Sequence, residues 1–139
     1  SEPDIAALFS DGRAQARQAD GSAAGSHPAW TPHPIQGWTP DFIPLVAQEA
    51  IDKNAIHKVM KVSGADAMKW AKALAQQEGI FCGISCGATF ATAIEVAASA
   101  EKGATILAML PDTGERYLST PLFGGIEADM DAEEKALSA

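Results

Sequence analysis

The chain has 139 residues, of which 47% are hydrophobic and 20% charged, and ten basic against eighteen acidic residues give a net charge of −8. This composition is typical of one globular domain and excludes a disordered or collagen-like chain. Because the average surface is negative, it repels phosphate backbones, and no sequence-independent nucleic-acid binding is expected.

The sequence also lacks membrane and secretory signals. Residues 79–94 contain no charged residue, but they are interrupted by glycine, serine and threonine. A membrane span needs roughly 20 mostly apolar residues. The first four residues have neither the basic patch nor the apolar run of a signal peptide. The two cysteines, Cys82 and Cys86, lie too close in sequence for a bridge to stabilise the fold much, so a reducing cytoplasm is expected.

The first third of the chain is predicted to be mostly irregular. Apolar residues near helical spacing in residues 4–17 predict a short helix. Residues 19–30 are rich in glycine, serine and alanine, and five of the eight prolines lie between positions 28 and 44, which excludes a regular helix or a central strand there. Trp30, Trp38 and Phe42 either pin this loop to the body or shape a binding cleft.

A repeating β-α pattern follows Pro44. Residues 57–62 predict a short strand, and Ser63 with Asp66 three positions later predicts the start of a helix that ends at Gly79. Residues 80–82 predict an extended apolar segment. A turn over residues 83–87 and a second helix over residues 88–100 are expected next.

The second helix and the segment after it are both predicted to be buried in the interior of the fold. Glu95 is the one charged residue between positions 88 and 100, so the helix must be covered on nearly all sides. Residues 105–110 predict a buried strand of the parallel-sheet kind, and residues 111–114 turn sharply at its carboxyl end. The expected fold class is therefore α/β, with helices layered on a sheet.

The carboxyl-terminal tail is distinct in charge. Residues 127–139 contain five acidic residues and one basic residue, which favours a solvated or frayed terminal helix over an acidic recognition tail. We therefore divide the chain into residues 1–126, the folded region, and residues 127–139, an acidic tail.

Residues 83–87, Gly-Ile-Ser-Cys-Gly, match the G-x-S-x-G pattern of a serine-hydrolase nucleophile. In that architecture the catalytic histidine follows the serine, whereas the three histidines here, His27, His33 and His57, all precede Ser85. The pattern instead predicts a tight turn. One role for this turn is to bind: its backbone N–H groups, with the dipole of the following helix, would face a cleft or an anion. The alternative is that its glycines serve only close helix packing.

No metal-ligand spacing is present, so no metal site is expected and the two thiols are predicted to behave as small buried hydrophobes.

A second polar constellation, residues 111–121, follows the predicted strand at residues 105–110. The carboxyl edge of an open α/β sheet is where ligands bind. Thr113, Glu115, Arg116 and Tyr117, the single tyrosine, are its candidate polar groups.

Three stretches resemble a known family: residues 79–88 (GIFCGISCGA), residues 110–123 (LPDTGERYLSTPLF), and residues 33–37 with 42–44. They are similar to the carboxyl-terminal half of cysteine synthase (O-acetylserine sulfhydrylase), a pyridoxal-phosphate enzyme of the tryptophan-synthase-β type, or fold type II. The resemblance covers residues 1–123 and implies a three-layer α/β sandwich.

The resemblance implies a β-replacement that makes L-cysteine from O-acetylserine and sulfide, with pyridoxal 5'-phosphate as the electron sink. It places Thr113 as the hydroxyl that hydrogen-bonds the pyridine nitrogen of the cofactor. Ser85 and Gly87 match the turn that borders the cofactor, and Gly37 matches the loop beside it. Gln36 and Trp38 belong to the substrate loop.

The departures from the family pattern are equally informative. Residues 38–41, Trp-Thr-Pro-Asp, replace a glycine-rich stretch, and residues 19–30 resemble an insertion. The family's Schiff-base lysine, substrate loop and phosphate cup would all precede Ser1. We therefore expect a fragment that contains no catalytic residue of its own, is inactive alone, and does not bind the cofactor alone.

The resemblance further implies a homodimer for the full-length enzyme and, as in some relatives, binding to serine acetyltransferase. Two alternatives stay open. One is a stand-alone, non-catalytic α/β module that binds a small molecule or a partner. The other is an enzyme similar to cystathionine β-synthase, which shares the fold but matches residues 110–123 less well.

Overall fold

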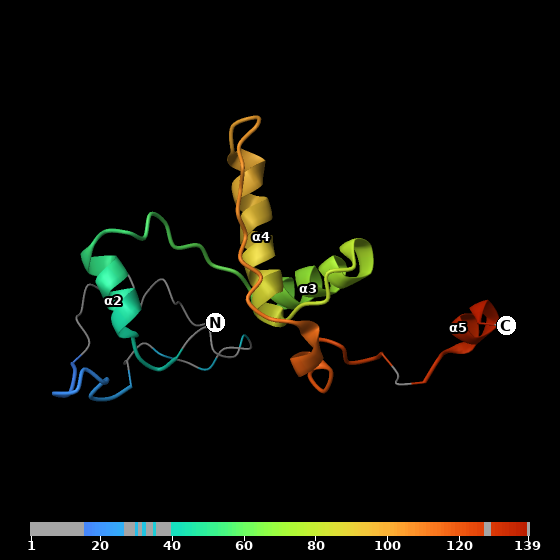
Figure 1. Ribbon diagram of the computed structural model, residues 1–139, viewed down its shortest axis with the longest axis horizontal. Helices are drawn as coiled ribbons and strands as arrows, with labels where there is room; N and C mark the ends of the chain where they lie inside the picture. The colour runs from blue at the N-terminus through green and yellow to red at the C-terminus, as the bar shows by residue number, and fades with distance from the viewer. Residues whose placement is uncertain are drawn as a thin grey trace.

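The computed structural model describes residues 16–26, 30, 32, 35, 40–126 and 129–138. Figure 1 shows helices α2 (Leu45–Asp52), α3 (Gly64–Glu78), α4 (Ile84–Ser99) and α5 (Ala132–Leu137), with a short 3₁₀ helix, η1 (Gly114–Tyr117), between α4 and α5. The helix predicted over residues 4–17 lies almost entirely outside the described residues. None of the described helices is long and apolar enough to cross a membrane.

Helix α3 begins and ends where the sequence predicts. The Ser63 side chain accepts the backbone N–H of Asp66 at 2.9 Å and so caps the first turn. Gly79 ends the helix in the left-handed conformation, with φ of 69°, which a glycine adopts without strain. Both predicted signals are confirmed.

We expect Ser63→Ala to lower the free energy of unfolding by about 1 kcal/mol, since one helix N–H loses its acceptor. Equilibrium denaturation with urea measures this change. Ser138→Ala is the matched control, because Ser138 is an exposed serine at the end of α5. An equal effect of the two substitutions would contradict the capping role of Ser63.

Helix α4 begins four residues earlier than predicted. Residues 83–87 were expected to form a turn, but only Gly83 lies outside the helix, as its extended N-cap. Helical geometry lets Ile84, Cys86 and Ala88, none of them more than 7% exposed, pack into the core. The hydroxyls of Thr89 and Thr92 donate to the carbonyls of Ser85 and Ala88, both at 3.1 Å, so these polar side chains are tolerated inside the helix.

The core of the described chain lies between α3, α4 and residues 117–123. One cluster of buried side chains joins the two helices to the segment after η1: Ile35, Ala67, Ala71, Ile84, Ala88, Leu122 and Phe123. A second cluster holds Leu74, Cys82 and Cys86 against Phe90 and Leu110. Both cysteines are free and buried, as predicted.

The two predicted strands, residues 57–62 and 105–110, are not strands in this structure. Both run extended, and the described residues form no sheet, only two isolated β-bridges, Arg17–Ala23 and Cys82–Thr113. The second segment runs back along α4 (Figure 1), and its side chains Leu107 and Met109 are 95% and 70% exposed. The prediction of a buried strand is wrong for this chain because a strand needs a neighbour to complete its hydrogen bonds.

Two further helices complete the described part. Helix α2, which the sequence analysis did not predict, begins after Pro44, and no side chain in it is buried. Helix α5 lies at one end of the molecule (Figure 1) and is exposed throughout, in agreement with the solvated terminal helix expected in the tail. Asp131 and Glu134 cap it reciprocally.

Residues 16–26 contain no helix and only one bridged pair, which agrees with the irregular segment predicted from residue 19 onward, whereas residues 16 and 17 are not part of a helix as predicted. The Arg17 guanidinium ties the segment to the chain before α2, because it donates to the Ile43 carbonyl at 2.8 Å. Trp30 and Phe42 are partly exposed. Trp38 lies outside the described residues.

Candidate functional site

The fold brings the two polar motifs of the sequence together. Cys82 and Thr113 form an antiparallel bridge, and the Gly114 N–H donates to the Phe81 carbonyl at 3.2 Å. Residues 81–87 therefore lie directly beside residues 112–114. This is the pair of segments that the resemblance placed at the cofactor, whereas Gln36, Gly37 and Trp38 lie outside the described residues.

Asp112 joins the two motifs through its side chain. Its carboxylate accepts hydrogen bonds from the Tyr117 hydroxyl at 2.5 Å, from the Ser85 hydroxyl at 3.3 Å and from the Cys86 thiol at 3.2 Å. The Cys86 thiol also lies 3.2 Å from the Asp112 carbonyl. Asp112 lies in the polar constellation of residues 111–121 but is not among its candidate polar groups. Its place after the predicted strand, two positions before a glycine, was the available signal.

The polar groups of this site lie in a partly dehydrated environment. The Asp112 carboxylate, as acceptor of the phenol proton, raises the pKa of Tyr117 to about 12, and burial adds to the effect. Burial, helped by the neighbouring Cys86 thiol, raises the pKa of Cys82 to about 12. Cys82 is therefore held as an unreactive thiol at neutral pH.

The shift at Tyr117 links the site to stability. The folded-state pKa of this phenol lies above its ordinary value of 10.0. A raised pKa means that the hydrogen bond to Asp112 contributes its full stabilisation below about pH 10. That contribution is lost as the pH rises through about 12.

The two candidate hydroxyls differ in environment. Ser85, in the first turn of α4, is 6% exposed. Thr113 is exposed, and its side chain hydrogen-bonds the Glu115 carboxyl and lowers the pKa of that group. Of the two, Ser85 is therefore the buried hydroxyl.

Glycines permit the close approach of the segments. A Cβ on Gly83 would overlap the Tyr117 ring and lie 2.5 Å from the Asp112 carboxylate. A Cβ on Gly114 would lie 2.7 Å from the Phe81 ring. Real Cβ atoms do not come this close to other atoms, so a side chain at either position would displace the Tyr117 or the Phe81 ring from its place.

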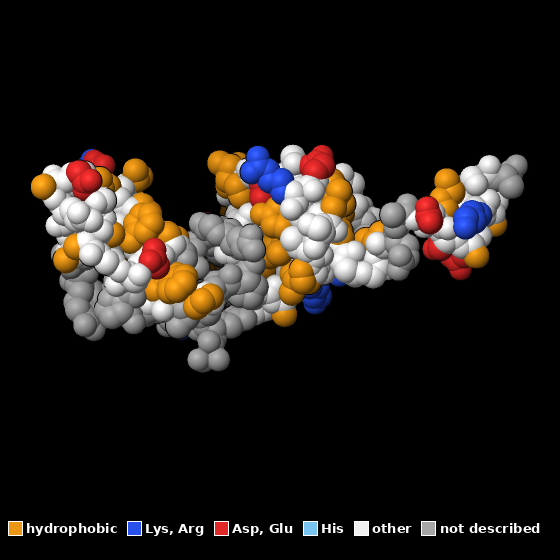
Figure 2. Space-filling model, turned by 90° about the horizontal axis from the view of Figure 1, so that it is seen from below, with side chains coloured by type: hydrophobic (Ala, Val, Ile, Leu, Met, Phe, Trp, Pro, Cys, Tyr) orange, Lys and Arg blue, Asp and Glu red, His pale blue; other side chains and the backbone are white. Residues whose placement is uncertain are grey.

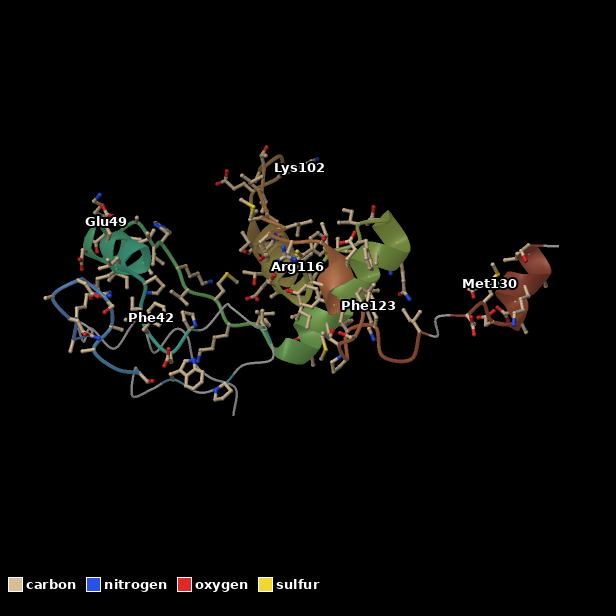
Figure 3. All side chains as sticks on the ribbon, turned by 60° about the horizontal axis from the view of Figure 1, so that its bottom comes forward. Phe42, Glu49, Lys102, Arg116, Phe123 and Met130 are labelled. Atoms are coloured by element: carbon tan, nitrogen blue, oxygen red, sulfur yellow. The ribbon has the colours of Figure 1, made fainter. Side chains whose placement is uncertain are left out.

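Figure 3 locates the site within the molecule. Arg116, in η1, marks the site region on the central body beside α3 and α4, while Lys102 lies at the far end of α4.

The Ser85 hydroxyl bonds a carboxylate, not a histidine, so the described residues do not form the hydrolase arrangement. They also hold no group of three or more potential metal ligands.

The chain matches an enzyme family over most of its length. A profile of pyridoxal-phosphate dependent enzymes covers residues 2–112, and the chain belongs to this family. Enzymes of the family use pyridoxal 5'-phosphate. Since solved relatives have fold type II, the fold type inferred by resemblance is supported, while the sandwich layering is not seen in the described residues.

Two curated relatives narrow the comparison. The chain is 48% identical over 102 residues to O-ureido-L-serine synthase of Streptomyces lavendulae, covering 73% of this chain and 30% of the relative. It is 40% identical over 92 residues to cysteine synthase of Staphylococcus aureus, covering 66% of this chain and 28% of the relative. The chain thus spans less than a third of the length of these two relatives.

Solved structures agree with the sequence matches. A mutant of O-ureido-L-serine synthase with O-ureido-L-serine bound superposes with a TM-score of 0.68 at 40% identity, over 99% of this chain and 37% of the other. O-acetyl serine sulfhydrylase isoform 3 from Entamoeba histolytica superposes with a TM-score of 0.61 at 34% identity, over 78% of this chain and 31% of the other.

The buried Ser85 hydroxyl suits the pyridine edge of the cofactor. A buried hydroxyl at the amino end of a helix is a suitable partner for a pyridine nitrogen. No lysine in the part that the structure describes is buried, so none of these lysines is placed as a Schiff-base residue would be.

Proposed function

We propose that this chain forms the pyridine-facing wall of a pyridoxal-phosphate site in an enzyme that replaces a substituent on the β-carbon of a serine derivative. The names of the two curated relatives support this reaction class. O-ureido-L-serine and L-cysteine both consist of an alanyl unit with a different heteroatom at the β-carbon. One elimination followed by one addition gives either product.

The observation that carries the proposal is the burial of the Ser85 hydroxyl at the start of α4. We propose that Ser85 donates to the pyridine nitrogen and that Gly87 keeps the adjoining backbone close. Thr113, which the family resemblance suggested for this role, is exposed to solvent. Thr113 is then better suited to shape the rim of the site.

The bound cofactor supplies the electron sink for the β-elimination. The residues of this chain bind and orient it. A neutral hydroxyl at the ring nitrogen hydrogen-bonds the unprotonated form without contributing a charge. The Gly83–Gly87 segment excludes water from that edge, since residues 83–87 are all buried.

The identities favour an O-ureido product over cysteine, at 48% against 40%. We propose O-ureido-L-serine formation as the leading activity and cysteine formation from O-acetylserine and sulfide as the second. Homodimer formation and binding to serine acetyltransferase are proposals that accompany the cysteine synthase alternative.

The proposal is tested on the natural gene product and on this chain. We expect this chain alone, titrated with pyridoxal phosphate, to show no stoichiometric band that borohydride can trap. The gene product, given O-acetylserine and either hydroxyurea or sulfide, is expected to release acetate and form the corresponding product, identified by mass. Loss of acetate release with both nucleophiles would contradict the reaction class and favour a non-catalytic binding module.

Paired substitutions test the residue assignment in the gene product. Ser85→Ala is expected to weaken cofactor binding by roughly 1–3 kcal/mol, because a ring nitrogen is left unpaired. Thr113→Ala is the matched control, with the smaller effect. A larger loss of cofactor affinity in Thr113→Ala than in Ser85→Ala would assign the contact with the pyridine nitrogen to Thr113.

A further inference from the structure

The Asp112 carboxylate receives three hydrogen bonds of unequal quality. The Tyr117 hydroxyl donates to Oδ2 at 2.5 Å, within the range of short, charge-assisted bonds. The Ser85 hydroxyl donates to Oδ1 at 3.3 Å, beyond the usual range for two oxygens. The Ser85 proton is therefore loosely held, while the Tyr117 proton is firmly held.

A carboxylate is a stronger hydrogen-bond acceptor than a pyridine nitrogen. Without Tyr117, the Asp112 carboxylate would therefore keep the hydrogen bond from Ser85. Tyr117 donates to the other oxygen, Oδ2, and this short hydrogen bond draws charge from the carboxylate, which makes Oδ1 a weaker acceptor for Ser85. The Tyr117 ring is also fixed, because it packs against the backbone of Gly83 with no room for a Cβ. The phenol is thus held in place against Asp112 by packing as well as by its hydrogen bond.

We propose that Tyr117 is a positioning residue: its hydrogen bond to Oδ2 weakens Asp112 as an acceptor, so that the Ser85 hydroxyl can turn from Oδ1 to an uncharged ring nitrogen. The inference rests on the proposed function, in which Ser85 faces the pyridine nitrogen. The ligand class is an aromatic nitrogen heterocycle bound in its unprotonated form.

The arrangement of the three groups is tested first without any cofactor. Tyr117 is the single tyrosine of the chain, so the absorbance change of tyrosinate reports this residue alone. The ionisable groups that act on it are Asp112 and Cys86, and the Ser85 hydroxyl is its third neighbour. We expect a midpoint near pH 12 in the unmodified chain.

Two substitutions should move this midpoint in opposite directions. Asp112→Asn removes the acceptor charge and is expected to lower the midpoint toward 10, the ordinary value. Ser85→Ala removes a hydroxyl that lowers the Tyr117 pKa and is expected to raise the midpoint. A midpoint near 10 in the unmodified folded chain, or one unchanged by Asp112→Asn, would overturn the arrangement.

Alkaline unfolding would obscure the titration, so a second measurement is made at pH 7. With ¹³Cζ-labelled tyrosine, the single Tyr117 resonance is expected to move toward the position of free tyrosine in Asp112→Asn. Circular dichroism of each variant verifies that the helices persist. An unchanged resonance would contradict the short hydrogen bond.

The positioning role itself is tested in the cofactor-loaded gene product by a double-mutant cycle. Tyr117→Phe is expected to weaken pyridoxal phosphate binding about fivefold, the value of one ordinary hydrogen bond, and to change the pH dependence of the cofactor absorbance. In the Ser85→Ala background the same substitution is expected to have no further effect.

The outcomes separate the two proposals. If Tyr117→Phe weakens binding equally with and without Ser85, Tyr117 does not act through Ser85, and the inference fails. If Ser85→Ala alone leaves binding and absorbance unchanged, the proposed pyridine contact fails, whatever the tyrosine titration has shown.

Discussion

Gly87→Ala is expected to destabilise the chain by at least about 3 kcal/mol, at or above the upper end of the usual cost of overpacking. A Cβ at this position would overlap the Ala67 carbonyl oxygen and lie 2.5 Å from the Ala71 nitrogen. Both atoms belong to the backbone of α3, so they cannot rotate away. The two helices would have to separate, and the buried side chains between them would lose contact.

The sign of this effect makes the experiment decisive. Inside a helix, alanine is ordinarily more stable than glycine by about 1 kcal/mol, so propensity alone predicts stabilisation. Gly25→Ala is the control, because a Cβ there has no atom within 4 Å. Urea denaturation of both variants is the measurement. A Gly87→Ala chain as stable as the unmodified one would contradict the close α3–α4 contact.

The isolated chain is expected to self-associate and to bind a hydrophobic dye. Apolar side chains gather over the central body in Figure 2. A groove of about 740 Å³ beside α4 is lined mainly by apolar residues, among them Ile56, Val96, Ile106 and Leu107. Large exposed apolar patches are uncommon on soluble monomers and mark surfaces that bind other chains.

Light scattering at several protein concentrations and dye fluorescence measure this behaviour. Leu107→Glu, which places a charge in the groove, is expected to reduce both signals. Leu137→Glu is the matched control, since Leu137 is 89% exposed on α5 and outside the groove. A monodisperse chain that binds no dye would show that the groove is covered in solution.

Local signals in the sequence determined several features. Ser63 and Gly79 fix the ends of α3 because capping depends on residues within one turn. The glycine, serine and alanine content of residues 19–30 predicted an irregular segment, which residues 19–26 confirm within the described chain. Motifs in residues 79–88 and 110–123 pointed to cysteine synthase, and the comparisons confirm the broader family of pyridoxal-phosphate dependent enzymes.

Tertiary structure decided the rest. The apolar run at residues 105–110 predicts a buried strand, yet burial depends on neighbours that the described residues do not provide, so Leu107 is exposed. The start of α4 depends on packing against α3, which no local signal specifies. Asp112 acquires its partner Ser85 only when two segments 27 residues apart meet, because a hydrogen bond is set by distance in space and not along the chain.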